Sequence, residues 1–223
     1  NAIGGVFAAV KTDTRRINKM VLKESVAMKI ALGQNPKMVY SDKSQTPSTR
    51  MATVALIREA FMKAIDYKED VERHQEDPSE NSKPDYDIKS AALIDVLNGK
   101  LPVKVHAHRA DDILTAIRLS KEFGFKLTVE HCTEGHFISD ILQEENVGCI
   151  CGPFMTDRSK LELKNLTPMT PGVLSNKGIK VAIMTDYPCT PIQYLPLCAS
   201  IAAKYGMGRE EALKAITINA AEL

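Results

Sequence analysis

The chain has 223 residues, of which 44% are hydrophobic and 26% are charged. This composition excludes an intrinsically disordered chain, a collagen and a disulfide-rich scaffold. The 29 basic residues nearly balance the 28 acidic residues, so nothing in the net charge points to nucleic acid or an anionic membrane surface as a partner. No apolar run reaches the roughly 18 residues that a membrane-spanning helix needs. We therefore expect one large domain, or part of one, over residues 1–223.

The first half of the chain contains one expected strand and two expected helices. The strand covers residues 25–32, and the Gly-Gln-Asn-Pro sequence at 33–36 is typical of a turn. Apolar spacing predicts helices at 51–67 and at about 87–97. The stretch at about 69–89 is dense in charge and contains two prolines, which predicts a solvated, mobile connector.

The second half of the chain alternates strands with helices. Strands are expected at 103–107, 126–131, 147–151 and 180–185. Helices are expected at 111–123, 136–145, a short stretch ending near 178, roughly 192–205, and 209–216. This rhythm predicts βα units and a parallel sheet, which both a doubly wound sheet and a (β/α)₈ barrel can supply. No glycine-rich nucleotide-binding sequence follows any strand, which weakens the case for a nucleotide-binding doubly wound sheet. The polar residues at the strand ends, described below, favour the barrel.

The five cysteines are odd in number and all lie in the second half of the chain. We interpret them as reduced thiols and expect a cytoplasmic protein. Cys149 and Cys151 lie two residues apart on one expected strand, so their sulfur atoms point to the same face. A zinc site would need a further Cys or His pair close by in the sequence, and none follows. Core packing is therefore the interpretation that we favour for both.

Histidines stand at the ends of two neighbouring expected strands, where function collects in α/β folds. His106 and His131 end strands that lie about 4.8 Å apart, so both imidazoles can reach one metal ion. Asp186 follows a more distant strand and reaches the same ion only if the sheet curls into a barrel. A single His at a strand end is more often a polar core residue with satisfied hydrogen bonds. Two of them, with an aspartate at a third strand end, are better explained by a metal site.

His108 lies two residues after His106, and strand alternation sends both imidazoles to the same side. One of the two is enough as a metal ligand. The other is free to contact a substrate or to support the ligands. The sequence leaves open which of them takes which role.

Three short sequences and a tail resemble the amidohydrolase superfamily. They are Val-His-Ala-His-Arg at 105–109, Val-Glu-His at 129–131, Met-Thr-Asp at 184–186, and the alanine-rich sequence at 212–222. The branch that they resemble most is that of the imidazolonepropionase-related and prolidase-like amidohydrolases. The resemblance implies an α/β fold, namely a partial (β/α)₈ TIM-like barrel that holds roughly strands 4–8 with their helices.

The resemblance also implies a set of metal ligands. The family's fifth-strand His matches His106, its sixth-strand His matches His131, and its eighth-strand Asp matches Asp186. The fourth strand of the family often supplies a Lys or Glu, and Lys29 lies on the matching segment. A lysine that faces solvent or a carboxylate is the alternative for Lys29. The family's first-strand His-x-His has no counterpart here, which implies that it lies before residue 1.

The resemblance implies a metal-dependent hydrolase of C–N bonds, in a cyclic amide, a peptide-like amide or an amino-heterocycle. The cofactor would be a divalent ion, with Zn²⁺ the expected one. Asp186 would take a proton from water and pass it to the leaving nitrogen, and the metal or His108 would polarise the reacting carbon. The alternative is a non-catalytic fragment or a small-molecule-binding scaffold that lacks the His-x-His ligands.

The expected partner is a small-molecule substrate. Arg109, Asn35 and Arg50 are candidates to hold an anionic group on it, although each can instead serve at the surface or at a helix cap. Tyr187 stands where many relatives have a His or another polar residue, so it is a candidate to shape the substrate pocket. The exposed strand edges of an incomplete barrel also predict a homo-oligomer.

Overall fold

The computed structural model describes residues 1–11, 15–41 and 43–223. The chain forms two compact units. The first comprises residues 1–31, 35–104 and 119–126, and the second comprises residues 32–34, 105–118 and 127–223. Within the described residues, no helix is both long and apolar enough to cross a membrane.

The first unit contains an antiparallel strand pair. β1 (Ile3–Val10) pairs with β2 (Val21–Ala31), which follows the short helix α1 (Ile17–Met20), and Val6 lies opposite Met28. The sequence predicts only part of β2, from residue 25 onward. β1 escapes prediction because its glycines and alanines form no apolar alternation and most of its residues are exposed.

The expected turn at 33–36 is wrong, because helix α2 (Gln34–Ser41) begins there. Pro36 is the third residue of this helix. A proline is tolerated in the first helical turn because the backbone N–H that it lacks has no partner within the helix.

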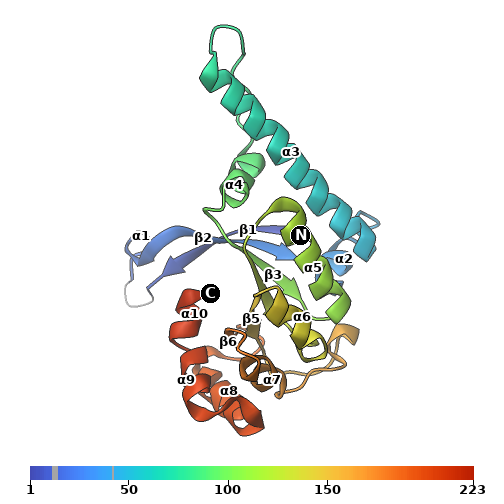
Figure 1. The fold of residues 1–223 in the computed structure, drawn as a ribbon, viewed down its shortest axis with the longest axis vertical. Helices are drawn as coiled ribbons and strands as arrows, with labels where there is room; N and C mark the ends of the chain where they lie inside the picture. The colour runs from blue at the N-terminus through green and yellow to red at the C-terminus, as the bar shows by residue number, and fades with distance from the viewer. Residues whose placement is uncertain (12–14, 42) are drawn as a thin grey trace. The chain divides into compact units, whose positions relative to one another are not determined.

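A long helix, α3 (Arg50–Glu76), dominates the first unit (Figure 1). The hydroxyl oxygen of Thr49 accepts a hydrogen bond from the Ala52 N–H and caps its first turn. The helix expected at 51–67 thus continues to Glu76, so the first part of the expected charged connector is helical. Its Lys and Glu residues are good helix formers and include the pair Lys68–Glu72 at i,i+4 spacing, which explains the extension.

Helix α4 (Ile88–Leu97) forms where the sequence predicts it. The carboxylate of Asp87 caps it by accepting hydrogen bonds from the backbone N–H groups of Lys89 and Ser90. The same carboxylate lies 2.9 Å from Lys63 Nζ on α3, which links the two helices. Hydrogen bonds from Lys63, Ser90 and Lys89 lower the pKa of Asp87.

The second unit contains four neighbouring strands in the order β3-β4-β5-β6. They are β3 (Val103–Ala107, of which residues 105–107 belong to this unit), β4 (Leu127–His131), β5 (Gly148–Cys151) and β6 (Val181–Ile183). β4 pairs with β5 in parallel, and β5 with β6. Most of their residues are buried, as expected for a parallel sheet covered on both faces.

Helices follow every strand of the second unit. They are α5 (Ala110–Phe123), η1 (Gly135–Ile138), α6 (Ser139–Glu144), η2 (Leu161–Leu163), α7 (Thr170–Asn176), η3 (Ile192–Tyr194), α8 (Leu195–Ala202), η4 (Ala203–Met207), α9 (Arg209–Ala215) and α10 (Ile218–Glu222). The helices expected at 136–145 and 192–205 each form as shorter consecutive pieces. Cys149 and Cys151 are buried free thiols, as the core interpretation expects. The α/β fold of a partial (β/α)₈ barrel is confirmed.

Phe61 is the main core residue of α3, and its loss should destabilise the first unit. Its side chain is fully buried and stacks on Phe123 and Phe125, with ring centroids 4.7 and 5.6 Å away. We expect Phe61→Ala to lower the free energy of unfolding by about 3–5 kcal/mol, measured by urea denaturation. Met62 is 53% exposed on the same helix, so Met62→Ala is the matched control. Equal effects of the two changes would contradict this assignment of the core.

Candidate metal centre

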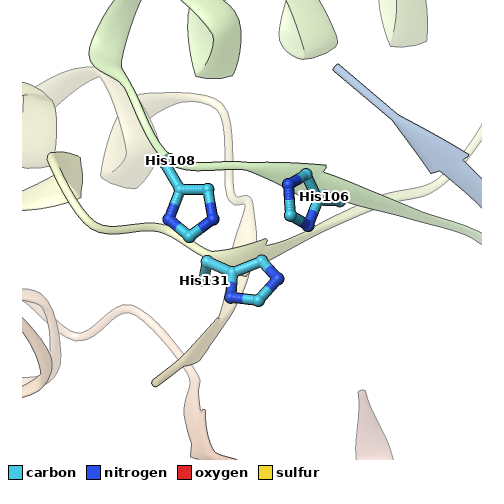
Figure 2. A group of neighbouring side chains, drawn as sticks. All are labelled: His106, His108 and His131. Atoms are coloured by element: carbon cyan, nitrogen blue, oxygen red, sulfur yellow. The ribbon is translucent and has the colours of Figure 1, made fainter. Parts of the chain in front are cut away.

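Three buried histidines of the second unit face one another (Figure 2). His106 and His108 come from β3 and the residue that follows it, and His131 ends β4. The ring centroid of His131 lies 4.3 Å from the ring centroids of both His106 and His108. The candidate ligand atoms of the three rings all lie within 4.8 Å of one another. We call these three residues the histidine cluster.

Backbone hydrogen bonds hold the two strand ends beside each other. The Cys132 N–H donates to the Ala107 carbonyl at 3.1 Å, and the Glu134 N–H donates to the His108 carbonyl at 2.8 Å. On the other side of β3, the Leu32 N–H donates to the His106 carbonyl at 2.9 Å. The histidine cluster therefore rests on the sheet itself, which favours a rigid arrangement of the rings.

His131 is held in the form that binds a metal. Its Nδ1 atom lies 2.9 Å from the carbonyl oxygen of Gly152. Because a carbonyl only accepts, Nδ1 carries a proton, and in the neutral ring Nε2 then keeps its lone pair. A hydrogen bond of this kind from the second ring nitrogen is typical of metal-ligating histidines.

The backbone at two strand ends adopts an unusual conformation. His131, Cys132 and Asp186 have positive φ angles of 68°, 50° and 50°. Residues other than glycine rarely adopt such angles, and they cluster at functional sites because the surrounding structure must over-determine them. The strain thus falls on two residues that the sequence selects as site residues.

His108 is uncharged at neutral pH. Burial lowers its pKa to about 2, helped by His131 and Lys160, while Asp186 acts in the opposite direction. Its Nδ1 atom lies 2.7 Å from the hydroxyl oxygen of Thr133. Three imidazole nitrogens form a donor set that suits zinc and other first-row transition metals, and the neutral form is the one that binds them. The residues present therefore fit a divalent ion.

Asp186 is exposed and follows β6. It is not a member of the histidine cluster, but it is close enough to act on the pKa of His108. Its Oδ2 atom accepts a hydrogen bond from the Cys189 thiol at a distance of 3.6 Å. Its expected roles as a metal ligand and as a proton acceptor stay predictions.

The expected substrate residues lie in both units. Arg109 belongs to the second unit, where its guanidinium makes two hydrogen bonds to Asp111, and this pairing raises its pKa. Tyr187 also belongs to the second unit and is 71% exposed. Asn35 and Arg50 lie in the first unit, at the starts of α2 and α3. Their roles toward a substrate stay predictions.

Lys29 lies on β2 in the first unit. Its Nζ atom lies 5.7 Å from the centroid of the Phe7 ring, at the distance of a cation–π contact. Its expected role as a metal ligand stays a prediction.

Sequence reasoning misses three groups around the histidine cluster. The Gly152 carbonyl and the Thr133 hydroxyl each contact an imidazole. Glu162, on η2, is 2% exposed, and its Oε1 atom lies 3.8 Å from His108 Nε2. No sequence motif identifies these three groups, because the tertiary fold, and not a fixed spacing in the sequence, brings each of them next to a histidine.

Loss of either His106 or His131 should abolish metal binding by the histidine cluster. We expect His106→Ala and His131→Ala each to lose the zinc that the unmutated chain takes up, because both changes remove a nitrogen donor. Elemental analysis after dialysis against zinc measures the content. His74→Ala is the control, since His74 lies in α3 of the first unit and bonds the Asn81 carbonyl. Unchanged zinc in both cluster variants would place the metal elsewhere.

The chain is similar to amidohydrolases in sequence and structure. The crystal structure of an amidohydrolase from Thermotoga maritima MSB8 matches all of this chain at 40% sequence identity with a TM-score of 0.96, and the match covers 57% of that protein. The amidohydrolase tasK of Hapsidospora irregularis is 26% identical over 206 residues, which are 85% of this chain and 20% of tasK. No family model matches the chain.

The chain therefore spans about half of the structural relative and a fifth of the curated one. A prolidase crystal structure is similar to a lesser degree, at 17% identity over 61% of this chain and 37% of the prolidase, with a TM-score of 0.43. The close structural match and the curated relative confirm the resemblance that the motifs indicate. In sequence and fold, the chain is similar to a segment of an amidohydrolase.

Proposed function

We propose that the chain forms part of a zinc-dependent hydrolase of C–N bonds. The observation that carries the proposal is the histidine cluster, in which three buried imidazoles meet at the ends of neighbouring strands. The similarity of the chain to proteins named amidohydrolases also supports hydrolysis of a C–N bond. A group of three buried imidazoles has no evident structural use that apolar side chains would not serve better.

The metal ion, when bound, supplies Lewis acidity that lowers the pKa of water and polarises the scissile bond. His106 and His131 would hold the ion through ring nitrogens. The carboxylate of Asp186 accepts the proton of the attacking water and delivers it to the leaving nitrogen, which needs a group that works in both directions. His108 hydrogen-bonds to the reacting carbonyl and withdraws charge from it.

The substrate class is a small molecule with a hydrolysable C–N bond, namely a cyclic amide, a peptide-like amide or an amino-heterocycle. Arg109 is proposed to hold its anionic group, and Tyr187 to shape the pocket. A guanidinium group suits a carboxylate because it presents paired donors. The free thiols of the chain support the further expectation of a reducing, cytoplasmic environment.

The second candidate function is a small-molecule-binding scaffold without catalysis. A scaffold would bind zinc or a small molecule through the same histidine cluster and leave amides intact.

The test is hydrolysis by the zinc-loaded chain of a panel of dipeptides, N-acyl amino acids and cyclic amides. We expect Asp186→Asn to reduce the rate by roughly 10²–10⁴-fold, because the amide cannot accept the proton. The zinc content of this variant should remain that of the unmutated chain if Asp186 acts mainly as the proton acceptor. Asp95→Asn, on α4 of the first unit, controls for the general effect of losing a carboxylate.

An equal rate in Asp186→Asn and the unmutated chain would contradict the role of Asp186. Zinc uptake without hydrolysis of any member of the panel would favour the scaffold over the enzyme.

A further inference from the structure

Glu162 is a buried carboxylate beside the histidine cluster that no sequence motif marks. Its side chain is 1% exposed, and it lies on η2, in the long segment between β5 and β6. Placing a carboxylate out of contact with water costs several kcal/mol unless the protein supplies compensating interactions. Its position therefore calls for a specific use.

The backbone of the segment 32–34 is built around this carboxylate. The Gln34 N–H donates a hydrogen bond to Glu162 Oε2 at 2.8 Å. Gly33, with φ of +76°, precedes it, and a Cβ atom at Gly33 would lie 2.7 Å from Glu162 Oε2. A side chain there would also approach the buried Asp112 Oδ2 atom at 3.2 Å. Gly33 is thus needed for both its backbone conformation and the space that the Glu162 carboxylate fills.

The other oxygen of the carboxylate faces His108. Glu162 Oε1 lies 3.8 Å from His108 Nε2, and Thr133 Oγ1 lies 2.7 Å from His108 Nδ1 on the opposite side of the ring. A threonine hydroxyl can donate or accept, so Thr133 does not choose which nitrogen carries the proton. A carboxylate only accepts, and its negative charge attracts an N–H. The pair therefore favours a proton on Nε2 and a lone pair on Nδ1.

We propose that Glu162 is a positioning residue that holds His108 in the Nε2–H tautomer, with the Thr133 hydroxyl donating to Nδ1. In this form the Thr133 hydroxyl holds Nδ1 and a proton occupies Nε2, so neither ring nitrogen of His108 offers a lone pair to a metal. His108 is then a hydrogen-bonding group of the site rather than a metal ligand, and the metal is left to His106 and His131. This role of His108 rests on the proposed function, whereas its tautomer does not.

The opposite tautomer of His131 gives a reference within the same site. His131 carries its proton on Nδ1 because the Gly152 carbonyl accepts from it. Two stacked imidazoles 4.3 Å apart thus hold opposite tautomers, His131 through its hydrogen bond to the Gly152 carbonyl and His108 through the charge of Glu162, whose Oε1 atom lies 3.8 Å from Nε2. His131 presents a lone pair at Nε2, and His108 presents an N–H at Nε2.

Long-range ¹H–¹⁵N spectra of the zinc-free chain at pH 7.5 test the proposal, since the imidazole nitrogen shifts report the tautomer directly. His108→Gln identifies the His108 signals by their loss. We expect Nε2–H for His108 and Nδ1–H for His131 in the unmutated chain. An Nδ1–H tautomer at His108 would overturn the proposal without any change to the protein.

Two independent variants then remove the influence of the carboxylate. Glu162→Leu replaces it with a side chain of similar size that cannot accept a hydrogen bond, and Gly33→Ala displaces it by the added Cβ atom. Both should abolish the preference of His108 for Nε2–H while leaving the His131 signals in place, which also shows that the site is folded. A His108 tautomer that persists in either variant with intact His131 signals contradicts the role of Glu162.

The controls match each change. Glu210 is an exposed carboxylate of α9 that pairs with Lys214, so Glu210→Leu tests the loss of a remote charge. Gly178 has φ of +80°, and no atom lies within 4 Å of the position that a Cβ atom would take there, so Gly178→Ala tests backbone strain alone. Neither should change the His108 tautomer.

Zinc titration separates this proposal from the proposed function. His108→Gln should retain the zinc of the unmutated chain, whereas His106→Gln should lose it. Loss of zinc from both would make His108 a ligand and refute its proposed role. If the unmutated chain takes up no zinc, the proposed function of this segment fails, and the tautomer measurement still decides the role of Glu162.

Discussion

The site depends on the contact between the carboxyl ends of β3 and β4. Backbone hydrogen bonds from Cys132 and Glu134 to the carbonyls of Ala107 and His108 fix this contact and bring three imidazoles together away from water. Burial then keeps His108 uncharged, because a charged imidazole loses its solvation there. The same burial strengthens every interaction that a ring nitrogen makes, so the identity of each acceptor matters more than it would at the surface.

Strain in the backbone is concentrated where the site requires particular side-chain directions. His131 and Asp186 both have positive φ, and both follow or end strands whose other residues are mostly buried. The regular pleat would alternate side chains between two covered faces, whereas a residue in the left-handed region leaves that alternation. The strand pairing and the buried Gly152 contact hold His131 in this conformation. The fold thus gives up part of its stability to aim two polar groups.

The sequence predicts the second unit well because apolar runs and helical spacing alternate there without interruption. It predicts the first unit less well for two physical reasons. β1 lacks apolar alternation, and the charged residues of α3 look like a connector although Lys68, Glu72 and their neighbours favour a helix. The histidine cluster is predictable from strand ends, since neighbouring strands have a known spacing. The role of Glu162 is not predictable from the sequence, because its approach to His108 depends on the conformation of the long segment between β5 and β6.

The surroundings of Glu162 explain why its carboxylate is tolerated in a buried position. Glu162 receives a backbone N–H from Gln34, and Gly33 leaves the space that its oxygen occupies, so two chain segments 128 residues apart in sequence share one group. The Gln34 contact supplies part of the solvation that burial removes, and the remaining oxygen can face His108. A neutral side chain of the same size would fill the space but would give no reason to prefer one ring nitrogen over the other. The geometry therefore separates two tasks, with Gly33 and Gln34 accommodating the charge and Glu162 acting on the imidazole.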